Sequence, residues 1–280
     1  MSPLPGPLKP QPPARAELEI FNARLSSHVL SQQSLTTADQ RQYRLFIATP
    51  RLDAPRDGVN FLYMLDGNAV FDTLTPELLS RAPGLFIVGI GYETPLRFDR
   101  AARSLDYTPA DDGAPPRPDP QYPDRMIGGA AAFLDRLARE IVPLIEADAG
   151  TGCRIRTLWG HSLAGMCTLY SLLRGGNGFQ RHVAVSPSLW WRNEFLLRME
   201  EALPRAPLAT DTLVMLGDSE RRSSPQAPQW NGPAPHTLEM IRRLERRGGG
   251  KITSQVFAGA GHAATLAASL EATLRYASRP

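Results

Sequence analysis

The stretch Leu158-Trp-Gly-His-Ser-Leu-Ala-Gly-Met166 decides how this chain is to be interpreted. An apolar run ends at Trp159 and gives way to small residues around Ser162, with Gly160 and Ala164 two positions to either side. A sharp strand-to-helix turn requires such small neighbours, because larger side chains would collide with the adjoining strand and helix. The pattern predicts that Ser162 is a nucleophile on an elbow; the alternative is a turn or helix-capping serine.

Short apolar runs alternate with helical patterns on both sides of this elbow. We expect strands at 43–49, 60–65, 85–90, 154–159, 182–185, 212–216 and 252–257, and helices at 129–147, after Ser162, at 237–247 and at 264–276. Continuous apolar strands are typical of a parallel sheet buried on both faces. The order predicts an α/β fold with a doubly wound, mostly parallel sheet, helices on both faces and no large lid domain. Pro143 could kink or split the helix at 129–147.

Composition sets the outer limits on function. The chain has 280 residues, 42% of them apolar, and no run near the ~20 apolar residues of a membrane helix. Residues 1–20 are rich in proline and without an apolar signal core, so we expect a flexible tail before a single domain at 21–280, and a cytoplasmic location. Cys153 and Cys167 are expected to be free thiols, and no metal or cofactor is expected.

The formal net charge is +3, and the basic residues are almost all arginines, since Lys9 and Lys251 are the only lysines. The charges are scattered and form no basic-aromatic stripe, so nucleic acid is not an expected partner. The arginines reflect either codon usage or the binding of an anionic ligand, for which a planar guanidinium is well suited.

A serine nucleophile needs a base, and in folds with this elbow the chain order is serine, acid, histidine. Among the five histidines, His28 and His161 are excluded by order, and His182 precedes any suitable acid. His236 follows a proline-rich stretch at the expected start of a surface helix. His262 lies in a glycine-rich loop after a late strand, where it can lean back over the nucleophile, and we predict that it is the base.

The acid should follow the preceding strand, in Leu213-Val-Met-Leu-Gly-Asp-Ser-Glu-Arg-Arg222. Glu220 is preferred, with Asp218 as the alternative. Either could fix the imidazole tautomer while the other pairs with Arg221 or Arg222. A serine–histidine dyad without an acid is the third possibility.

An oxyanion hole needs two backbone N–H groups that point at the developing charge. The N–H of Leu163, next to the nucleophile, is the expected first donor. The second is expected from Leu65-Asp-Gly-Asn-Ala69, with Gly67 allowing close approach and Asn68 as the donor; an ordinary turn is the alternative. The proline- and aspartate-rich segment 106–125 is either a flap over the site or a plain surface loop.

Several further segments carry a family resemblance. They are Tyr63-Met-Leu-Asp-Gly-Asn-Ala-Val-Phe71, Val88-Gly-Ile-Gly-Tyr92, Arg103-Ser-Leu-Asp-Tyr-Thr-Pro109, Gly160-His-Ser-Leu-Ala-Gly165, Ser186-Pro-Ser-Leu-Trp-Trp191 and Gly261-His262. Together they resemble the siderophore trilactone esterases, α/β-hydrolases that open enterobactin, salmochelin or bacillibactin. The similarity runs from about residue 34 to residue 277.

The resemblance implies a serine esterase that hydrolyses the ester bonds of a catecholate siderophore and so releases iron inside the cell. It implies Ser162 and His262 as the catalytic pair and Arg103 as a contact to the anionic ligand, although Leu105 stands where relatives often carry a second arginine. Trp190 or Trp191 could stack on the substrate or simply pack in the core. The iron would belong to the substrate, and we expect a monomer. The rival functions are a general carboxylesterase or thioesterase and a non-hydrolytic siderophore-binding protein.

Overall fold

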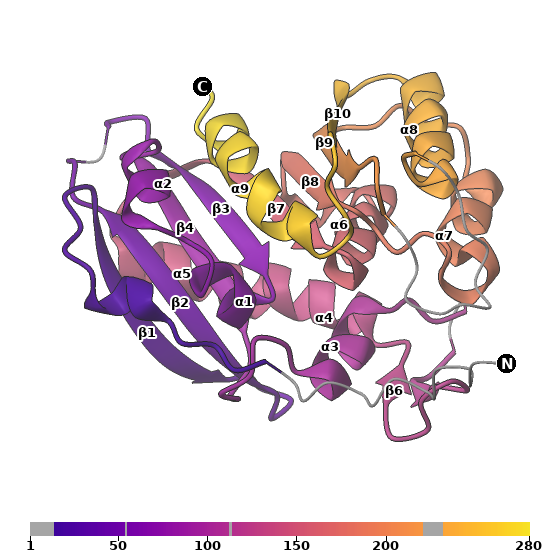
Figure 1. The fold of residues 1–280 in the computed structure, drawn as a ribbon, viewed down its shortest axis with the longest axis horizontal. Helices are drawn as coiled ribbons and strands as arrows, with labels where there is room; N and C mark the ends of the chain where they lie inside the picture. The colour runs from indigo at the N-terminus through magenta and orange to yellow at the C-terminus, as the bar shows by residue number, and fades with distance from the viewer. Residues whose placement is uncertain (1–13, 54, 112–113, 221–231) are drawn as a thin grey trace, which may run out of the picture.

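The computed structural model describes residues 14–53, 55–111, 114–220 and 232–280. One large sheet crosses the molecule, with its strands in the order β1-β2-β4-β3-β7-β8-β9-β10 (Figure 1). The strands are β1 (His28–Thr36), β2 (Gln42–Pro50), β3 (Val59–Leu65), β4 (Leu85–Gly91), β7 (Cys153–His161), β8 (Arg181–Val185), β9 (Asp211–Gly217) and β10 (Ile252–Phe257). β2 is antiparallel to both β1 and β4, and the remaining neighbours are parallel. The predicted α/β fold with a mostly parallel sheet is confirmed.

Helices cover both faces of this sheet. In Figure 1, α1 (Gly67–Phe71), α2 (Pro76–Ser80) and α9 (Ala264–Ala277) lie in front of it. The opposite face carries α4 (Ala130–Arg136), α5 (Val142–Ala149), α6 (Leu163–Leu173), α7 (Trp191–Ala202) and α8 (Pro235–Arg247). Because the central strands are covered on both sides, β3 and β4 are buried along their whole length. Each face has its own apolar core, and no separate lid domain is present among the described residues.

The helix expected at 129–147 contains an irregular turn. A π-helical segment, η2 (Leu137–Ile141), joins α4 to α5 while the backbone stays in the right-handed helical region. Pro143 lies just beyond it and has no N–H to donate, and a π-turn is a common way to accommodate a break in the regular hydrogen-bond ladder. The proline therefore produces a π-turn and does not split the helix.

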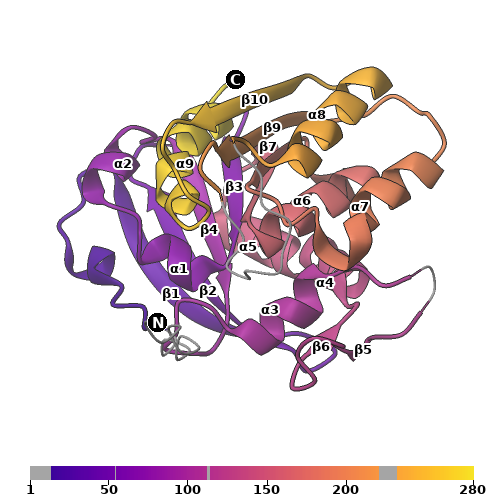
Figure 2. The ribbon, with the colours of Figure 1, turned by 45° about the vertical axis from the view of Figure 1, so that its right-hand side comes forward.

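The segment 106–125 is partly structured. Two short strands, β5 (Arg117–Pro118) and β6 (Met126–Ile127), pair in antiparallel fashion, and Figure 2 shows them beside α3 (Arg100–Tyr107). Asp111 accepts a 2.8 Å hydrogen bond from Arg192 of α7, while residues 112–113 lie outside the described part. A flap role for this segment stays a prediction.

Residues 1–13 of the expected tail lie outside the described residues. From residue 14 onward the chain is attached to the domain. The N–H of Ala16 donates to the carbonyl of Pro95, and the N–H groups of Glu17 and Leu18 donate to Asp72. A short 3-10 helix, η1 (Glu19–Asn22), follows and packs Ile20 into the core, and a second, η3 (Gly176–Gly178), precedes β8.

Candidate active site

Ser162 occupies the turn between β7 and α6, with φ 60° and ψ −116°. This conformation is rare for a residue with a side chain and holds the hydroxyl out from the sheet edge. Two glycines make the turn possible: a Cβ on Gly160 would lie 2.3 Å from the carbonyl oxygen of Ala164, and one on Gly165 would lie 2.8 Å from that of Val185. The small residues of the motif are therefore required by close backbone contacts.

The structure brings the predicted base and the preferred acid to this serine. His262 Nε2 lies 2.9 Å from Ser162 Oγ, and His262 Nδ1 lies 3.2 Å from Glu220 Oε2. His262 comes from the loop between β10 and α9, and Glu220 follows β9, so the three residues meet at the carboxyl ends of the parallel strands. Hydroxyl, imidazole and carboxylate are in the order that lets the imidazole accept the serine proton while the acid stabilises its cation.

Glu220 is buried and receives several donors. Its Oε1 accepts 2.7 Å from the N–H of Gly217 and 2.5 Å from the hydroxyl of Ser186. Burial alone would raise the pKa of Glu220, but the hydrogen bonds from His262, Ser186 and the Gly217 N–H outweigh it and lower that pKa. The carboxylate is thus held ionised next to the imidazole.

Asp218, the alternative acid, has a different position. Its Oδ1 accepts 2.7 Å from the N–H of Gly259 and 2.9 Å from the hydroxyl of Ser219. Asp218 therefore binds the loop after β10 and makes no hydrogen bond to His262 among those found in the described residues. The arginines considered as partners for the unused acid, Arg221 and Arg222, lie outside the described part.

The other histidines lie elsewhere, except one. His182 is buried in β8 with Nε2 3.3 Å from Ser171 Oγ, His28 binds the carbonyl of Leu85, and His236 pairs with Glu194. His161 is next to the nucleophile in sequence but binds groups of the loop and helix that follow β10. Its Nε2 lies 2.9 Å from the main-chain carbonyl oxygen of His262.

Three adjacent strands end in residues with positive φ: Asp66 after β3 (58°), Ser162 after β7 (60°) and Ser186 after β8 (43°). None is glycine, so each carries some backbone strain, on the order of 1–3 kcal/mol. Strain of this kind often clusters at functional sites, and here all three residues lie at the edge of the sheet where the candidate catalytic side chains meet.

The predicted oxyanion donors are both in the first turns of helices. Leu163 begins α6, and Asn68 is the second residue of α1, so their backbone N–H groups have no acceptor within the helix. β3 and β7 are parallel neighbours, with Met64 paired to Trp159, which places the start of α1 beside the elbow. The Asn68 side chain is occupied elsewhere: it accepts 2.9 Å from the N–H of Tyr92 and donates to the carbonyls of Tyr92 and Thr94. Only its backbone N–H can serve as the donor, and this role remains a prediction.

Arg103 is paired inside the protein. Its Nε and Nη2 donate 3.0 and 2.8 Å to the two carboxylate oxygens of Asp66, whose side chain is 1% exposed. The guanidinium carbon lies 5.2 Å from the ring centre of Phe98 and 5.6 Å from that of Tyr107. Tyr107 in turn accepts from the N–H of Asp66 at 3.1 Å. Nη1 has no acceptor among the described residues, so Arg103 can still donate to a ligand although its charge is balanced.

Trp190 and Trp191, considered as either stacking or core residues, differ in exposure. Trp191 is 8% exposed and meets Phe195 edge-on at 5.9 Å, so it belongs to the core. Trp190 is half-buried at the start of α7, packed against the same core. Of the two, Trp190 is the more exposed.

Sequence reasoning assigned no role to Ser186 and Ser188. Both follow β8 in Ser186-Pro-Ser-Leu-Trp-Trp191, and both are 2% exposed. Ser186 binds Glu220 as described, and Ser188 Oγ lies 3.2 Å from Ser162 Oγ. The signal available in the sequence was their place at the carboxyl end of a strand next to the elbow.

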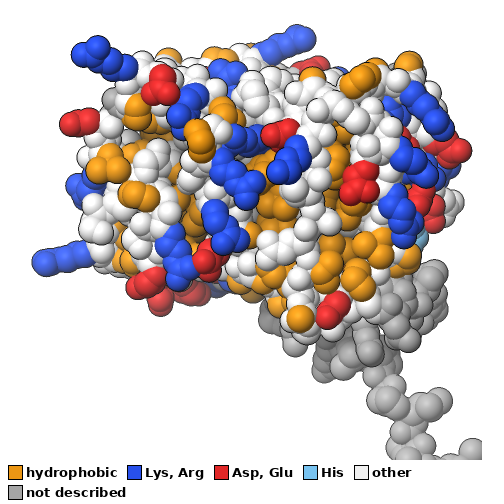
Figure 3. Space-filling model, turned by 90° about the horizontal axis from the view of Figure 1, so that it is seen from above, with side chains coloured by type: hydrophobic (Ala, Val, Ile, Leu, Met, Phe, Trp, Pro, Cys, Tyr) orange, Lys and Arg blue, Asp and Glu red, His pale blue; other side chains and the backbone are white. Residues whose placement is uncertain are grey.

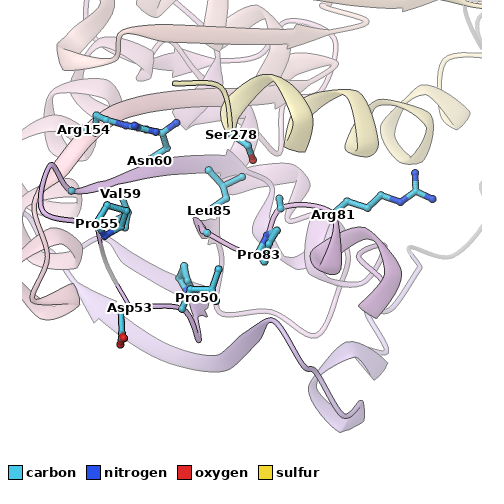
Figure 4. A pocket seen from close by; sticks show the side chains of 14 residues that line it. Pro50, Asp53, Pro55, Val59, Asn60, Arg81, Pro83, Leu85, Arg154 and Ser278 are labelled. Carbon is cyan, nitrogen blue, oxygen red and sulfur yellow. The ribbon is translucent and has the colours of Figure 1, made fainter.

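A pocket of about 260 Å³ lies at the opposite edge of the sheet, at the amino ends of β3 and β4. Figure 4 shows Asn60, Leu85 and Arg154 among its lining residues, and it contains none of the catalytic candidates.

The described part of the chain has no group of three or more His, Cys, Asp or Glu side chains placed to hold a metal ion. None of its helices is long and apolar enough to cross a bilayer. Acidic and basic side chains are interspersed on the face seen in Figure 3.

The family model "Putative esterase" matches residues 36–244 of this chain. The chain belongs to this esterase family. Ferri-bacillibactin esterase BesA of Bacillus subtilis (strain 168) is 31% identical over 260 residues, with 86% of each chain covered. The apo-salmochelin esterase of Escherichia coli O6:H1 is 36% identical over 182 residues, covering 64% of this chain and 57% of that protein.

Solved structures of esterases share the fold over nearly the whole chain. The enterobactin and salmochelin hydrolase IroE superposes with a TM-score of 0.75 at 28% identity, covering 94% of this chain and all of that one. The same enzyme in complex with DFP gives 0.75 at 29% identity, with the same coverage of both chains. The site described above thus lies within the fold of a serine ester hydrolase.

Proposed function

We propose that this protein is a serine esterase that hydrolyses the ester bonds of a siderophore trilactone and so allows its iron to be released. The observation that supports the chemistry best is the hydrogen-bonded series Ser162–His262–Glu220, with 2.9 and 3.2 Å between neighbouring groups. The substrate class is supported by the relative of 31% identity whose name is ferri-bacillibactin esterase and by the likeness to IroE.

In this proposal, Ser162 Oγ attacks an ester carbonyl carbon while His262 Nε2 takes the hydroxyl proton. Glu220 accepts a hydrogen bond from Nδ1–H of His262, so Nε2 carries no proton and can accept one. The carboxylate also stabilises the imidazolium that results. The backbone N–H groups of Leu163 and Asn68 bind the negative oxygen. His262 then gives its proton to the departing alcohol, and a water molecule hydrolyses the acyl-enzyme by the same steps in reverse.

Arg103 contributes to substrate binding through directed hydrogen bonds. Because Asp66 balances its charge, attraction at long range is weak, and its contribution comes from the unoccupied N–H donors facing catecholate-type oxygens. Trp190 supplies an aromatic surface for stacking. Arg103→Met should therefore weaken siderophore hydrolysis more than hydrolysis of a small nitrophenyl ester. Arg242→Met, which breaks an exposed pair with Glu239, is the matched control.

The deciding experiment gives purified protein ferric and iron-free enterobactin and separates the products by chromatography. We expect ring opening, and a loss of about 10⁴ to 10⁶ in turnover for Ser162→Ala, the scale found when the nucleophile of such a unit is removed. Near-normal hydrolysis by that variant would overturn the nucleophile. Hydrolysis of simple esters with no opening of either trilactone would favour a general carboxylesterase, and the absence of fluorophosphonate labelling would favour a binding protein.

The cytoplasmic location and the monomeric state expected from the sequence are further parts of this proposal. Cell fractionation and size-exclusion chromatography of the purified protein test them.

A further inference from the structure

Behind the catalytic pair, buried polar groups form a continuous chain of short contacts. Thr265 Oγ1 lies 2.7 Å from the carbonyl oxygen of His262 and 2.6 Å from Ser186 Oγ, which lies 2.5 Å from Glu220 Oε1. His161 Nε2 joins the chain, 2.9 Å from the same carbonyl oxygen and 3.2 Å from Thr265 Oγ1. These groups connect the backbone of the base to the carboxylate of the acid.

The number of available protons restricts how this chain can be arranged. A carboxylate and a carbonyl only accept, and each hydroxyl has one proton to give. The Ser186 proton goes to Glu220, and the Thr265 proton goes to the carbonyl of His262. Because a carbonyl oxygen only accepts, the 2.9 Å contact between His161 Nε2 and the carbonyl of His262 requires the imidazole proton on Nε2.

The surroundings of His161 agree with this assignment. Its Nδ1 is buried without a hydrogen-bond partner in the described structure, as a nitrogen without a proton in an apolar setting can be. Burial lowers the pKa of His161 to about 3, and the neighbouring charges of His262 and Arg103 act in the same direction. The ring is therefore neutral near pH 7, with a single proton.

The base depends on such support because packing holds it weakly. The side chain of His262 is 36% exposed, and it lies on a loop between β10 and α9. A displacement of about 1 Å in a catalytic group can reduce the rate ~100-fold. Hydrogen bonds to its backbone carbonyl and to its carboxylate partner are thus what fix its position over Ser162.

We infer that His161 is a positioning residue: its Nε2–H binds the carbonyl of His262, to which Thr265 also donates, while the Ser186 hydroxyl donates to Glu220. Hydrogen bonds therefore hold His262 both at its backbone carbonyl and at its imidazole. This inference rests on the proposed catalytic series, but not on the identity of the substrate.

The first test compares two substitutions of His161. His161→Gln keeps an N–H donor at about the reach of Nε2, and His161→Leu removes it. We expect His161→Leu to lower kcat for a nitrophenyl ester, and the rate of fluorophosphonate labelling of Ser162, by roughly 10- to 100-fold, with KM within about twofold. His161→Gln should recover to within about fivefold of the wild type.

His182→Leu is the matched control, because His182 is equally buried and neutral but, among the described residues, hydrogen-bonds to Ser171 and to no group of the site. It should lose stability toward urea while kcat stays within about twofold of the wild type. If His161→Leu and His182→Leu have equal kcat, or if His161→Gln is no better than His161→Leu, the inference is wrong.

Helix α9 offers a second comparison, in case the His161 variants fail to fold. Thr265→Val removes the hydroxyl that binds the carbonyl of His262 and contacts Ser186, whereas Thr273→Val removes a buried hydroxyl whose hydrogen bond among the described residues is to the carbonyl of Ser269 within the helix. We expect the first to slow fluorophosphonate labelling about tenfold, Thr265→Ser to restore it, and the second to leave it unchanged. Equal labelling by both valine variants would contradict the proposed support of His262 through its carbonyl.

Nitrogen NMR of the wild-type protein tests the proton assignment directly. The imidazole of His161 should show the Nε2–H tautomer throughout pH 5–8, and an Nδ1–H signal would refute it. Failure of the proposed function is recognised separately: a labelled but trilactone-inactive protein would exclude only the substrate, and an active Ser162→Ala variant would exclude the catalytic series itself.

Discussion

Replacement of Glu220 by glutamine tests how the acid controls the base. The substitution keeps the shape of the side chain, removes its charge and converts one oxygen into an NH2 group. Which oxygen is converted matters, because Oε1 and Oε2 have different partners.

The surrounding donors fix the orientation of the new amide. The N–H of Gly217, at 2.7 Å, points at the Oε1 position and cannot turn away, and the hydroxyl of Ser186 reaches the same position. The amide oxygen must therefore stay there, and the NH2 group faces His262 Nδ1. Because NH2 donates, Nδ1 must accept, and the only imidazole proton moves to Nε2, where it faces Ser162 and blocks proton transfer.

The expected loss in kcat for Glu220→Gln is on the order of 10⁴, the scale seen when a neutral amide imposes the wrong tautomer on a catalytic histidine. That factor equals about 5 kcal/mol of transition-state stabilisation. Glu220→Ala imposes no tautomer, and water can reach the partly exposed imidazole, so we expect it to retain at least ~10-fold more activity than the glutamine variant.

The assay is kcat/KM for a short nitrophenyl ester, together with the rate of fluorophosphonate labelling. Glu146→Gln is the matched control, because Glu146 is also a largely buried carboxylate with several partners, Arg156 at 2.6 Å and Tyr63 at 3.1 Å, but lies outside the site. It should cost stability and leave kcat unchanged. A glutamine variant as active as the alanine variant would refute the reasoning.

Three further predictions follow from the same geometry. Ser188→Ala removes the donor that lies 3.2 Å from Ser162 Oγ; we expect slower acyl-enzyme breakdown, about 5- to 10-fold, seen as a larger nitrophenol burst. Gly165→Ala places a Cβ 2.8 Å from a carbonyl of β8 and should reduce the free energy of unfolding by roughly 1–3 kcal/mol in urea titrations. Burial lowers the pKa values of His161 and His182 to about 3, whereas a histidine in the unfolded chain has a pKa near 6.5. At a pH below about 6.5, unfolding therefore takes up protons on both side chains. Stability should therefore fall as the pH drops from 6.5, by ~2 kcal/mol for each histidine at pH 5, and His182→Leu should remove its own share.

The elbow, the parallel strands and the histidine that lies beside Ser162 could be predicted because each depends on local patterns. Gly160 and Ser162 mark a steric requirement of one turn, and chain order selects His262 among the histidines. The choice of acid could not be made in the same way. Asp218 and Glu220 lie in one loop, and only the fold shows that Asp218 turns to Gly259 while Glu220 turns back to the base.

Other features carry no clear sequence signal. The edge strand β1 alternates between exposed and half-buried positions and has few apolar residues, so its pattern resembles that of a loop. Three consecutive residues of α7 have positive φ values, although none is glycine, so the sequence gives no signal of this conformation. They are Arg192, Asn193 and Glu194. The partner of Arg103 was also missed, because Asp66 is far away in the sequence and its pairing depends on how α3 packs beside the end of β3.

The contacts made by the three strained side chains at the sheet edge explain why these positions are not glycine. Glycine would adopt the backbone of Asp66, Ser162 and Ser186 more easily. Each residue instead carries a side chain that the site uses: Asp66 binds Arg103, Ser162 binds His262, and Ser186 binds Glu220. The strain is therefore a cost in stability that the fold accepts in order to place a polar group where a strand ends. Since β3, β7 and β8 are successive neighbours in the sheet, these costs fall on one edge of the molecule, and that edge is where the ester would be hydrolysed.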